Sequence, residues 1–212
     1  MIETYKKSLH LTSKQKEILI GLMLGDGHLE TQNNGKTYRL KVEQSMRHKA
    51  YVDWLYEQFR EWVLTPPQKK TKEYQGIKTD HYWFSTVSSG SFRFFGQQFY
   101  DTRKKIVPPL IHRWLTPQAL AIWFMDDGAL KSQHHRARII HTQGFMKKDV
   151  VHLCSVLTEK YQLLCQPRKQ KDGYRIMILA ESAEQFADLI RPYILSSLRY
   201  KLEGLGTHMP KR

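Results

Sequence analysis

One short segment occurs twice in this chain, and the repeat limits the folds that the chain can adopt. The first copy, residues 18–29, reads ILIGLMLGDGHL, and the second, residues 120–130, reads LAIWFMDDGAL. The two copies align at an offset of 101 residues, so that Asp26 corresponds to Asp127. A self-match at this distance indicates a duplicated unit. We therefore expect two halves that share one architecture.

Both copies lie at the end of a predicted helix. The segment TSKQ at residues 12–15 has the spacing of a capping box, which marks the start of the first helix. Before the second copy, Thr116 is a good N-cap and Pro117 suits the first helical position. The first helix is apolar on nearly all sides near its end, so we expect that end to be buried.

Hydrophobic periodicity and turn signals extend the prediction to the remaining chain. In the first half we expect a helix up to Gly25, strands at 28–32 and 36–44, a helix over 46–63, strands at 69–74 and 78–87, and a helix over 91–100. In the second half we expect a helix up to Asp127, strands at 130–132 and 136–143, a helix over 146–161, strands at 165–171 and 174–180, and a helix over 182–191. Residues 1–10 should form an irregular arm, and residues 193–212 carry no clear pattern. The expected fold class is α+β, with two pseudo-symmetric αββαββα halves, 1–100 and 117–212, joined by a basic segment, 101–116.

The charge of the chain favours a polyanionic partner. Its 34 Lys and Arg residues exceed its 20 Asp and Glu residues, which gives a net charge of +14. Such an excess is most often found in nucleic-acid-binding proteins. No long apolar span, lipidation signal or basic amphipathic helix indicates a membrane. The N-terminus lacks a signal peptide, so we expect an intracellular protein, either in an organelle (mitochondrion or chloroplast) or in bacterial or phage cytoplasm.

Small residues in the two motif helices allow the helices to pack closely. These residues are Gly21, Gly25 and Ala121. Close packing would bring Asp26 and Asp127 together, where two carboxylates repel each other unless they are protonated or bridged by a cation. Hard oxygen ligands suit Mg²⁺ or Mn²⁺, which also bind phosphate oxygens. This arrangement predicts metal-assisted hydrolysis of a phosphodiester.

Basic and amide side chains recur in the predicted strands. Such side chains can contact phosphates and base edges, and a sheet face is long enough to lie in a major groove. The candidate DNA-binding residues are Gln32, Arg39, Lys41, Lys70, Lys72, Lys78, Arg136, Arg138, Gln166, Arg168, Gln170 and Arg175.

The paired motifs resemble those of a known family. GLMLGDG at residues 21–27 and AIWFMDDG at residues 121–128 are similar to the two motifs of a monomeric LAGLIDADG homing endonuclease. The resemblance continues through short segments such as WVLTPP at 62–67 and KKIVP at 104–108, and it covers nearly the whole chain beyond the first ten residues.

The resemblance implies a DNA-binding saddle that cuts both strands of a long asymmetric site across the minor groove and leaves short 3′ overhangs. It implies that the metal-binding set consists of Asp26, Asp127, Gly25 and Asp126, and that the catalytic set consists of Asp26, Asp127, Lys105, Lys201, Gln44 and Gln143. Because Gly25 stands where the second motif has Asp126, the halves should contribute unequally, and one strand should be cut faster.

Two functions of other kinds are alternatives to a monomeric DNA endonuclease. The first is a maturase that binds intron RNA on the same scaffold. The second is a DNA-binding regulator without catalytic activity. The presence of Asp26 and Asp127 in both motifs favours cleavage over either alternative.

Overall fold

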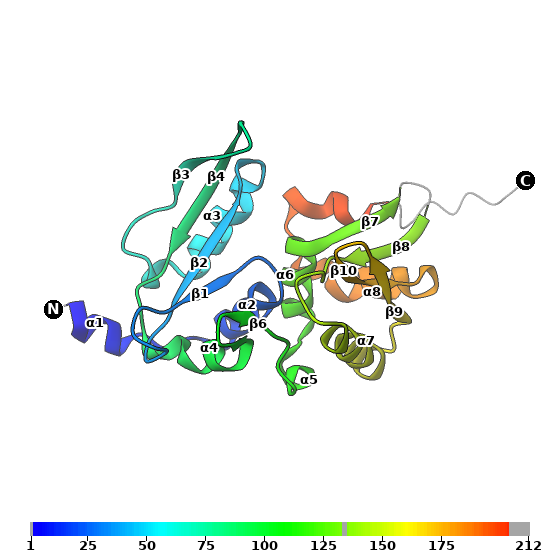
Figure 1. The fold of residues 1–212 in the computed structure, drawn as a ribbon, viewed down its shortest axis with the longest axis horizontal. Coiled ribbons are helices and arrows are strands. Elements are labelled where there is room, and N and C mark those ends of the chain that lie inside the picture. Colours follow the sequence, from blue (N-terminus) through cyan, green and yellow to red (C-terminus); the bar gives the residue numbers. More distant parts are fainter. Residues whose placement is uncertain (1, 133–134, 204–212) are drawn as a thin grey trace, which may run out of the picture.

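Two sheets of identical topology dominate the computed structural model, which describes residues 2–132 and 135–203 (Figure 1). Both sheets have four antiparallel strands, in the order β1-β2-β4-β3 in the first and β7-β8-β10-β9 in the second. The same order in both sheets confirms the α+β fold with two αββαββα halves. The final nine residues of the chain, 204–212, lie outside the described residues.

Each half follows the predicted sequence of elements. The first half contains α2 (Ser13–Leu24), β1 (His28–Glu30), β2 (Arg39–Ser45), α3 (Lys49–Gln58), β3 (Gln68–Tyr74), β4 (Ile77–Ser85) and α4 (Arg93–Phe99). The second half contains α6 (Pro117–Asp127), β7 (Gly128–Ser132), β8 (His135–Ile140), α7 (Lys147–Tyr161), β9 (Cys165–Gln170), β10 (Gly173–Ile178) and α8 (Ala183–Ile190). A 3₁₀ segment, Ser196–Leu202, ends the described chain.

The motif helices α2 and α6 lie side by side at the centre, with one half of the molecule on each side (Figure 1). Thr12 and Gln15 form the predicted capping box at the start of α2. Gly21 explains the close packing, because a Cβ atom there would lie 2.5 Å from both the Ala119 carbonyl oxygen and the Ile122 Cβ of α6. The buried core runs through this junction without interruption.

Two predictions about local structure were wrong. Residues 2–8 form a helix, α1 (Ile2–Ser8), which is attached to the body by the Tyr5 hydroxyl donating to the Glu61 carbonyl. The helix expected over 46–63 is interrupted, because Phe59 leaves helical geometry at φ −118° and a 3₁₀ turn follows.

The segment between the halves has secondary structure of its own. It contains a two-stranded ribbon, β5 (Tyr100–Asp101) with β6 (Lys104–Lys105), and a short helix, α5 (Ile111–Trp114). The turn of the ribbon places Thr102 at φ +58°. This ribbon gives Lys105 a fixed position beside the end of α2.

Among the helices of residues 2–132 and 135–203, none has the length and apolar character needed to span a membrane.

Candidate active site

The C-terminal ends of α2 and α6 bring three carboxylates together. Asp26 follows α2 and is exposed, whereas Asp126 and Asp127 form the last turn of α6 and are partly buried. The charges of Asp26 and Asp127 act on each other strongly enough to change the pKa of Asp127. The duplicated motifs therefore converge on one centre, as their offset predicts.

One lysine lies at the end of each motif helix. Lys105 on β6 donates from Nζ to the Gly25 carbonyl oxygen at 2.6 Å. Lys201, on the last 3₁₀ segment, donates to the Met125 carbonyl oxygen at 2.6 Å and to the Asp126 carbonyl oxygen at 3.2 Å. Positive charge is favoured here because carbonyl dipoles make the C-terminal end of a helix electronegative.

The side chain of Asp126, which belongs to the second half, contacts residues of the first half. Its Oδ2 accepts a hydrogen bond from the Asp26 backbone N–H at 3.0 Å, and its Oδ1 accepts from Gln44 Nε2 at 3.3 Å. Gly25 makes room for this carboxylate, because a Cβ atom at position 25 would overlap Asp126 Oδ2. The two motifs thus differ at this position because the small Gly25 leaves space for the side chain of Asp126.

The two predicted glutamines differ in their contacts. Gln44 Nε2 donates to Asp26 Oδ2 at 2.8 Å, which places it in the carboxylate cluster. Gln143 instead has its Nε2 3.4 Å from His141 Nδ1. The structure therefore brings Gln44 to the acids and does not show an equivalent contact for Gln143, so the pseudo-symmetry ends at this position.

Burial and nearby negative charge make Asp126 and Asp127 hard to ionise. Burial, followed by the charge of Asp26, raises the pKa of Asp127 to about 7. The same two causes raise the pKa of Asp126 well above its usual range. Burial lowers the pKa of Lys105 and of Lys201, and the three carboxylates oppose that effect. A bound cation would relieve the repulsion between the acids.

The donor set fits a hard divalent cation. It comprises the carboxylates of Asp26 and Asp127 and the carbonyl oxygens of Gly25 and Asp126, and the carbonyl oxygens already accept hydrogen bonds from ammonium groups. In the described part of the chain, no three His, Cys, Asp or Glu side chains form a closed metal-binding group. An open set of this kind suits Mg²⁺ or Mn²⁺, which take further ligands from water and phosphate.

Two other side chains near the acids were not among the sequence candidates. His48 follows β2, and burial followed by the charge of Lys201 lowers its pKa, with Asp26 acting in the opposite direction. Tyr51 on α3 is buried, and burial followed by the charge of Asp126 raises its pKa. The sequence gives no signal for Tyr51 at this site, because an aromatic residue at helical spacing is typical of a core position.

Comparison with known proteins decides the family. The sequence pattern of the LAGLIDADG DNA endonuclease family matches residues 16–186. The chain belongs to the LAGLIDADG DNA endonuclease family.

Relatives of this LAGLIDADG chain include nucleases and a maturase. Probable intron-encoded endonuclease 1 of Wickerhamomyces canadensis is 34% identical over 209 residues, which cover 95% of this chain and 90% of that protein. The structure of the homing endonuclease I-WcaI bound to its DNA recognition sequence has a TM-score of 0.89 and 32% identity, and the alignment covers 95% of this chain and 91% of that chain. Cytochrome b mRNA maturase bI2 of Saccharomyces cerevisiae is 30% identical over 203 residues, which cover 87% of this chain and 46% of that protein.

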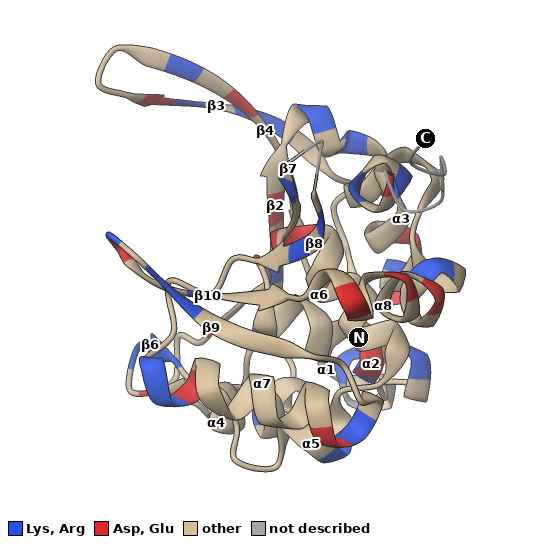
Figure 2. Ribbon diagram, turned by 90° about the vertical axis from the view of Figure 1, so that its right-hand side faces the viewer, with Lys and Arg blue, Asp and Glu red and all other residues tan. Residues whose placement is uncertain are grey.

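Basic segments of this LAGLIDADG chain gather on its projecting hairpins. Lysines and arginines lie along the β3–β4 and β9–β10 hairpins, and both hairpins project to the same side of the molecule (Figure 2). The register places Gln166, Arg168 and Gln170 of β9 opposite Met177, Arg175 and Gly173 of β10. Gln32 lies just after β1 and is exposed.

In the first half, strand register separates the candidates into two faces. Arg39, Lys41, Lys70 and Lys72 share the face turned away from the buried side chains of Leu40, Val42 and Phe84. Lys78 pairs with Glu73, and it therefore lies on the opposite face of the β3–β4 hairpin from Lys70 and Lys72. Of these five candidate DNA-binding residues, Lys78 alone lies away from the face that the other four share.

The same reasoning removes two arginines from the expected DNA face. Arg138 is fully buried, and it donates to the carbonyl oxygens of Leu202 and Glu203 at 3.1 and 2.9 Å. Arg136, two positions earlier, turns to the same side and pairs with Glu184 of α8 at 3.0 Å. The prediction was wrong because β8 points its even positions toward the helices. Arg138 instead fixes the segment that carries Lys201.

Proposed function

We propose that this chain cuts both strands of duplex DNA at a long, asymmetric site, with Asp26 and Asp127 each serving one strand. The observation that carries the proposal is the repeated arrangement at the ends of α2 and α6, where a lysine donates to the backbone carbonyl that precedes each acid. Cleavage should leave short 3′ overhangs. One chain supplies both acids, so a monomer is sufficient.

The residues of the proposed active site have different roles. The carboxylates of Asp26 and Asp127 and the carbonyl oxygens of Gly25 and Asp126 would hold Mg²⁺ or Mn²⁺. Such a cation, when bound, polarises the phosphate and activates water. Gln44 orients Asp26 through its 2.8 Å hydrogen bond. Lys105 and Lys201 add fixed positive charge where negative charge develops on the phosphate.

A library experiment tests the proposal directly. The protein would be incubated with Mg²⁺ and a randomised duplex library, and the cut ends would be sequenced. We expect one long consensus whose two strands are cut at positions offset by a short 3′ overhang. Uncut DNA, or cuts without a consensus, would refute site-specific cleavage.

Calcium should separate binding from cutting. Ca²⁺ accepts more ligands and a looser geometry than Mg²⁺, so it should support DNA binding without a productive arrangement at the phosphate. Fluorescence anisotropy should show target binding in Ca²⁺, and a gel should show cleavage only after Mg²⁺ is added. Efficient cleavage in Ca²⁺ alone would contradict the proposed metal chemistry.

Replacing either lysine should slow one strand more than the other. Lys105→Met and Lys201→Met each remove a charge worth about 100-fold in rate at a developing anion. Nicking of each labelled strand should be followed separately, because each lysine lies at one helix end. Lys148→Met, an exposed substitution on α7, is the matched control. Equal nicking rates for all three variants would show that neither lysine contributes to cleavage.

Binding of intron RNA is a second candidate, favoured by the similarity to a maturase. It predicts that an intron RNA that the protein binds is spliced faster in the presence of the protein. Asp26→Asn should leave that acceleration unchanged, because splicing assistance does not need the nuclease acids. A splicing assay with and without the protein would decide, and an unchanged rate would exclude this role.

A further inference from the structure

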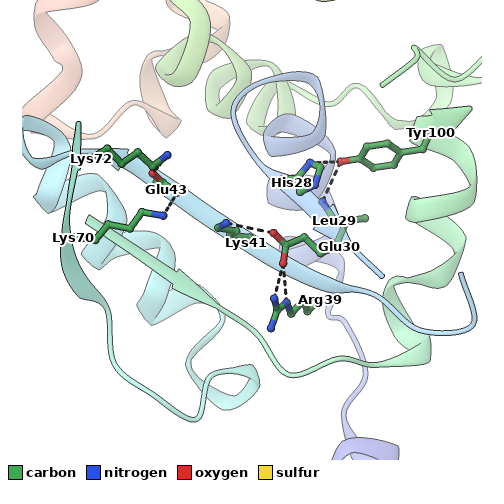
Figure 3. A network of polar contacts seen from close by, with 9 residues as sticks. All are labelled: His28, Leu29, Glu30, Arg39, Lys41, Glu43, Lys70, Lys72 and Tyr100. Carbon is green, nitrogen blue, oxygen red and sulfur yellow. Dashed lines mark hydrogen bonds and ion pairs between the residues drawn. The ribbon is translucent and has the colours of Figure 1, made fainter. Parts of the chain in front are cut away.

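Two glutamates lie on the face of the first sheet that carries its four candidate DNA-binding cations. Glu30 on β1 lies opposite Arg39 on β2, and Glu43 lies farther along β2 (Figure 3). Their side chains are 25% and 15% exposed, so both are partly enclosed by their neighbours. An acid on such a face opposes DNA phosphates unless it has a specific role.

Both oxygens of each carboxylate are engaged. Arg39 donates to Glu30 Oε2 from Nε at 2.9 Å and from Nη2 at 2.7 Å, and Lys41 donates to Oε1 at 3.3 Å. Lys70 pairs with Glu43 Oε2 at 2.6 Å, and Lys72 pairs with Oε1 at 2.5 Å (Figure 3). Each glutamate therefore holds two of the four predicted DNA-binding cations on this face.

These contacts are stable networks and not chance surface pairs. Partial burial would raise the pKa of both glutamates, but the hydrogen bonds and charges of their basic partners outweigh it and lower the pKa. Lys70 also lies over the Trp83 ring, 5.2 Å from its centroid, and His81 Nδ1 is 3.2 Å from Glu43 Oε1. The lysine positions are thus set before DNA arrives.

The second half differs in this respect. Arg168 and Arg175 lie opposite each other on the β9–β10 hairpin, and within the described residues neither forms an ion pair with an acid. Unpaired cations gain most from phosphates, because each neutralised phosphate releases counterions. Paired cations gain less, since a phosphate must first displace a carboxylate.

We propose that Glu30 and Glu43 are specificity-determining residues that direct Arg39, Lys41, Lys70 and Lys72 toward base edges and away from phosphates. This inference rests on the proposed DNA endonuclease function. Acidic side chains placed among basic side chains lower the affinity of the protein for wrong DNA sequences. This is a recognised route to specificity. The first half then supplies mainly sequence discrimination, and the β9–β10 hairpin supplies mainly phosphate affinity.

The chemistry matches a cytosine–guanine pair in the major groove. A carboxylate oxygen has two acceptor sites, so Glu30 Oε1 and Glu43 Oε2, which each accept one hydrogen bond from a lysine, keep capacity for a cytosine N4 amino group. A lysine has three donors, so Lys70 and Lys72 keep donors for the O6 and N7 acceptors of the paired guanine. Each cluster therefore presents an acceptor beside donors, which complements the amino donor of cytosine and the two acceptors of guanine.

The test compares binding of Glu30→Gln and Glu43→Gln with wild type on non-target duplex in Ca²⁺, across a range of KCl concentrations. Released cations should reach phosphates, and each new phosphate contact should steepen the slope of log K against log salt by about 0.9. We expect non-target binding about tenfold tighter at 0.1 M salt and a target preference at least about tenfold weaker. Asp188→Asn makes the same change in charge on α8, beside Arg191, and should leave both quantities unchanged.

Cation substitutions complete the comparison. Lys70→Met should weaken discrimination at one or two base pairs with little change in salt slope, whereas Arg168→Met should flatten the slope by about 0.9 and keep the base preferences. If wild type shows no salt-dependent duplex binding, the proposed function itself fails. If wild type binds but both glutamate variants match Asp188→Asn, the role of the glutamates is overturned and the nuclease proposal stands.

Discussion

Asn in place of Asp26 or Asp127 should abolish double-strand cleavage while DNA binding persists. Each substitution keeps the shape of the side chain but removes the charge that would hold a divalent cation. Metal-assisted charge stabilisation contributes several kcal/mol to such reactions, and its loss corresponds to a rate at least about 1,000-fold slower. Cleavage is measured on a supercoiled plasmid that carries the target, so that nicked and linear products are separated.

The same experiment distinguishes the two strands. If each acid serves one strand, either single variant should still nick slowly, and the double variant should be inert. Asp53→Asn on α3 is the matched control, because Asp53 pairs with Lys49 on the surface. Wild-type cleavage by either motif variant would remove that acid from the centre and end the proposal as stated.

Adding a single methyl group at Gly21 should disturb both folding and cutting. The new Cβ would lie 2.5 Å from the Ala119 carbonyl oxygen and 2.5 Å from the Ile122 Cβ, and neither atom is a flexible side-chain end. The helices must separate, at a cost on the order of 2–3 kcal/mol in the free energy of unfolding. A separation of about 1 Å at the helix ends can lower a rate about 100-fold.

Gly144→Ala is the control for this prediction, since a Cβ atom there meets nothing within 4 Å. Denaturant unfolding measures stability, and single-turnover cleavage measures the rate. Gly21→Ala with wild-type stability would show that α2 and α6 tolerate a wider spacing. A destabilised variant with wild-type turnover would show that the distance between the acids is not limiting.

The sequence predicts the repeated elements well because duplication and capping are local signals. Thr12 and Gln15 identify the start of α2 within four residues, and the motif copies identify which acids correspond. By contrast, Arg138 could not be assigned to a face, because β8 has apolar side chains at both odd and even positions. Only the pairing of Arg138 with Ile178 shows which face is covered.

Long-range contacts were the part of the site that sequence could not supply. The hydrogen bond from Gln44 to Asp26 depends on how β2 passes α2, and Gln143 has no such contact although its position in the repeat is equivalent. The ion pairs of Glu30 and Glu43 join residues on different strands, so they depend on strand register. Register is fixed by packing between the strands. The interpretation of the strands as simply basic was therefore incomplete.

The contact between Gly25 and Asp126 has a consequence for protein engineering. Each motif helix has its own acid and its own lysine, so one half resembles an interchangeable module that could be grafted onto a half from a relative. The carboxylate of Asp126, however, supports the backbone of Asp26 in the other half. A chimera that joins the first half to a foreign second half therefore needs an acid at position 126 to keep this hydrogen bond to the Asp26 backbone.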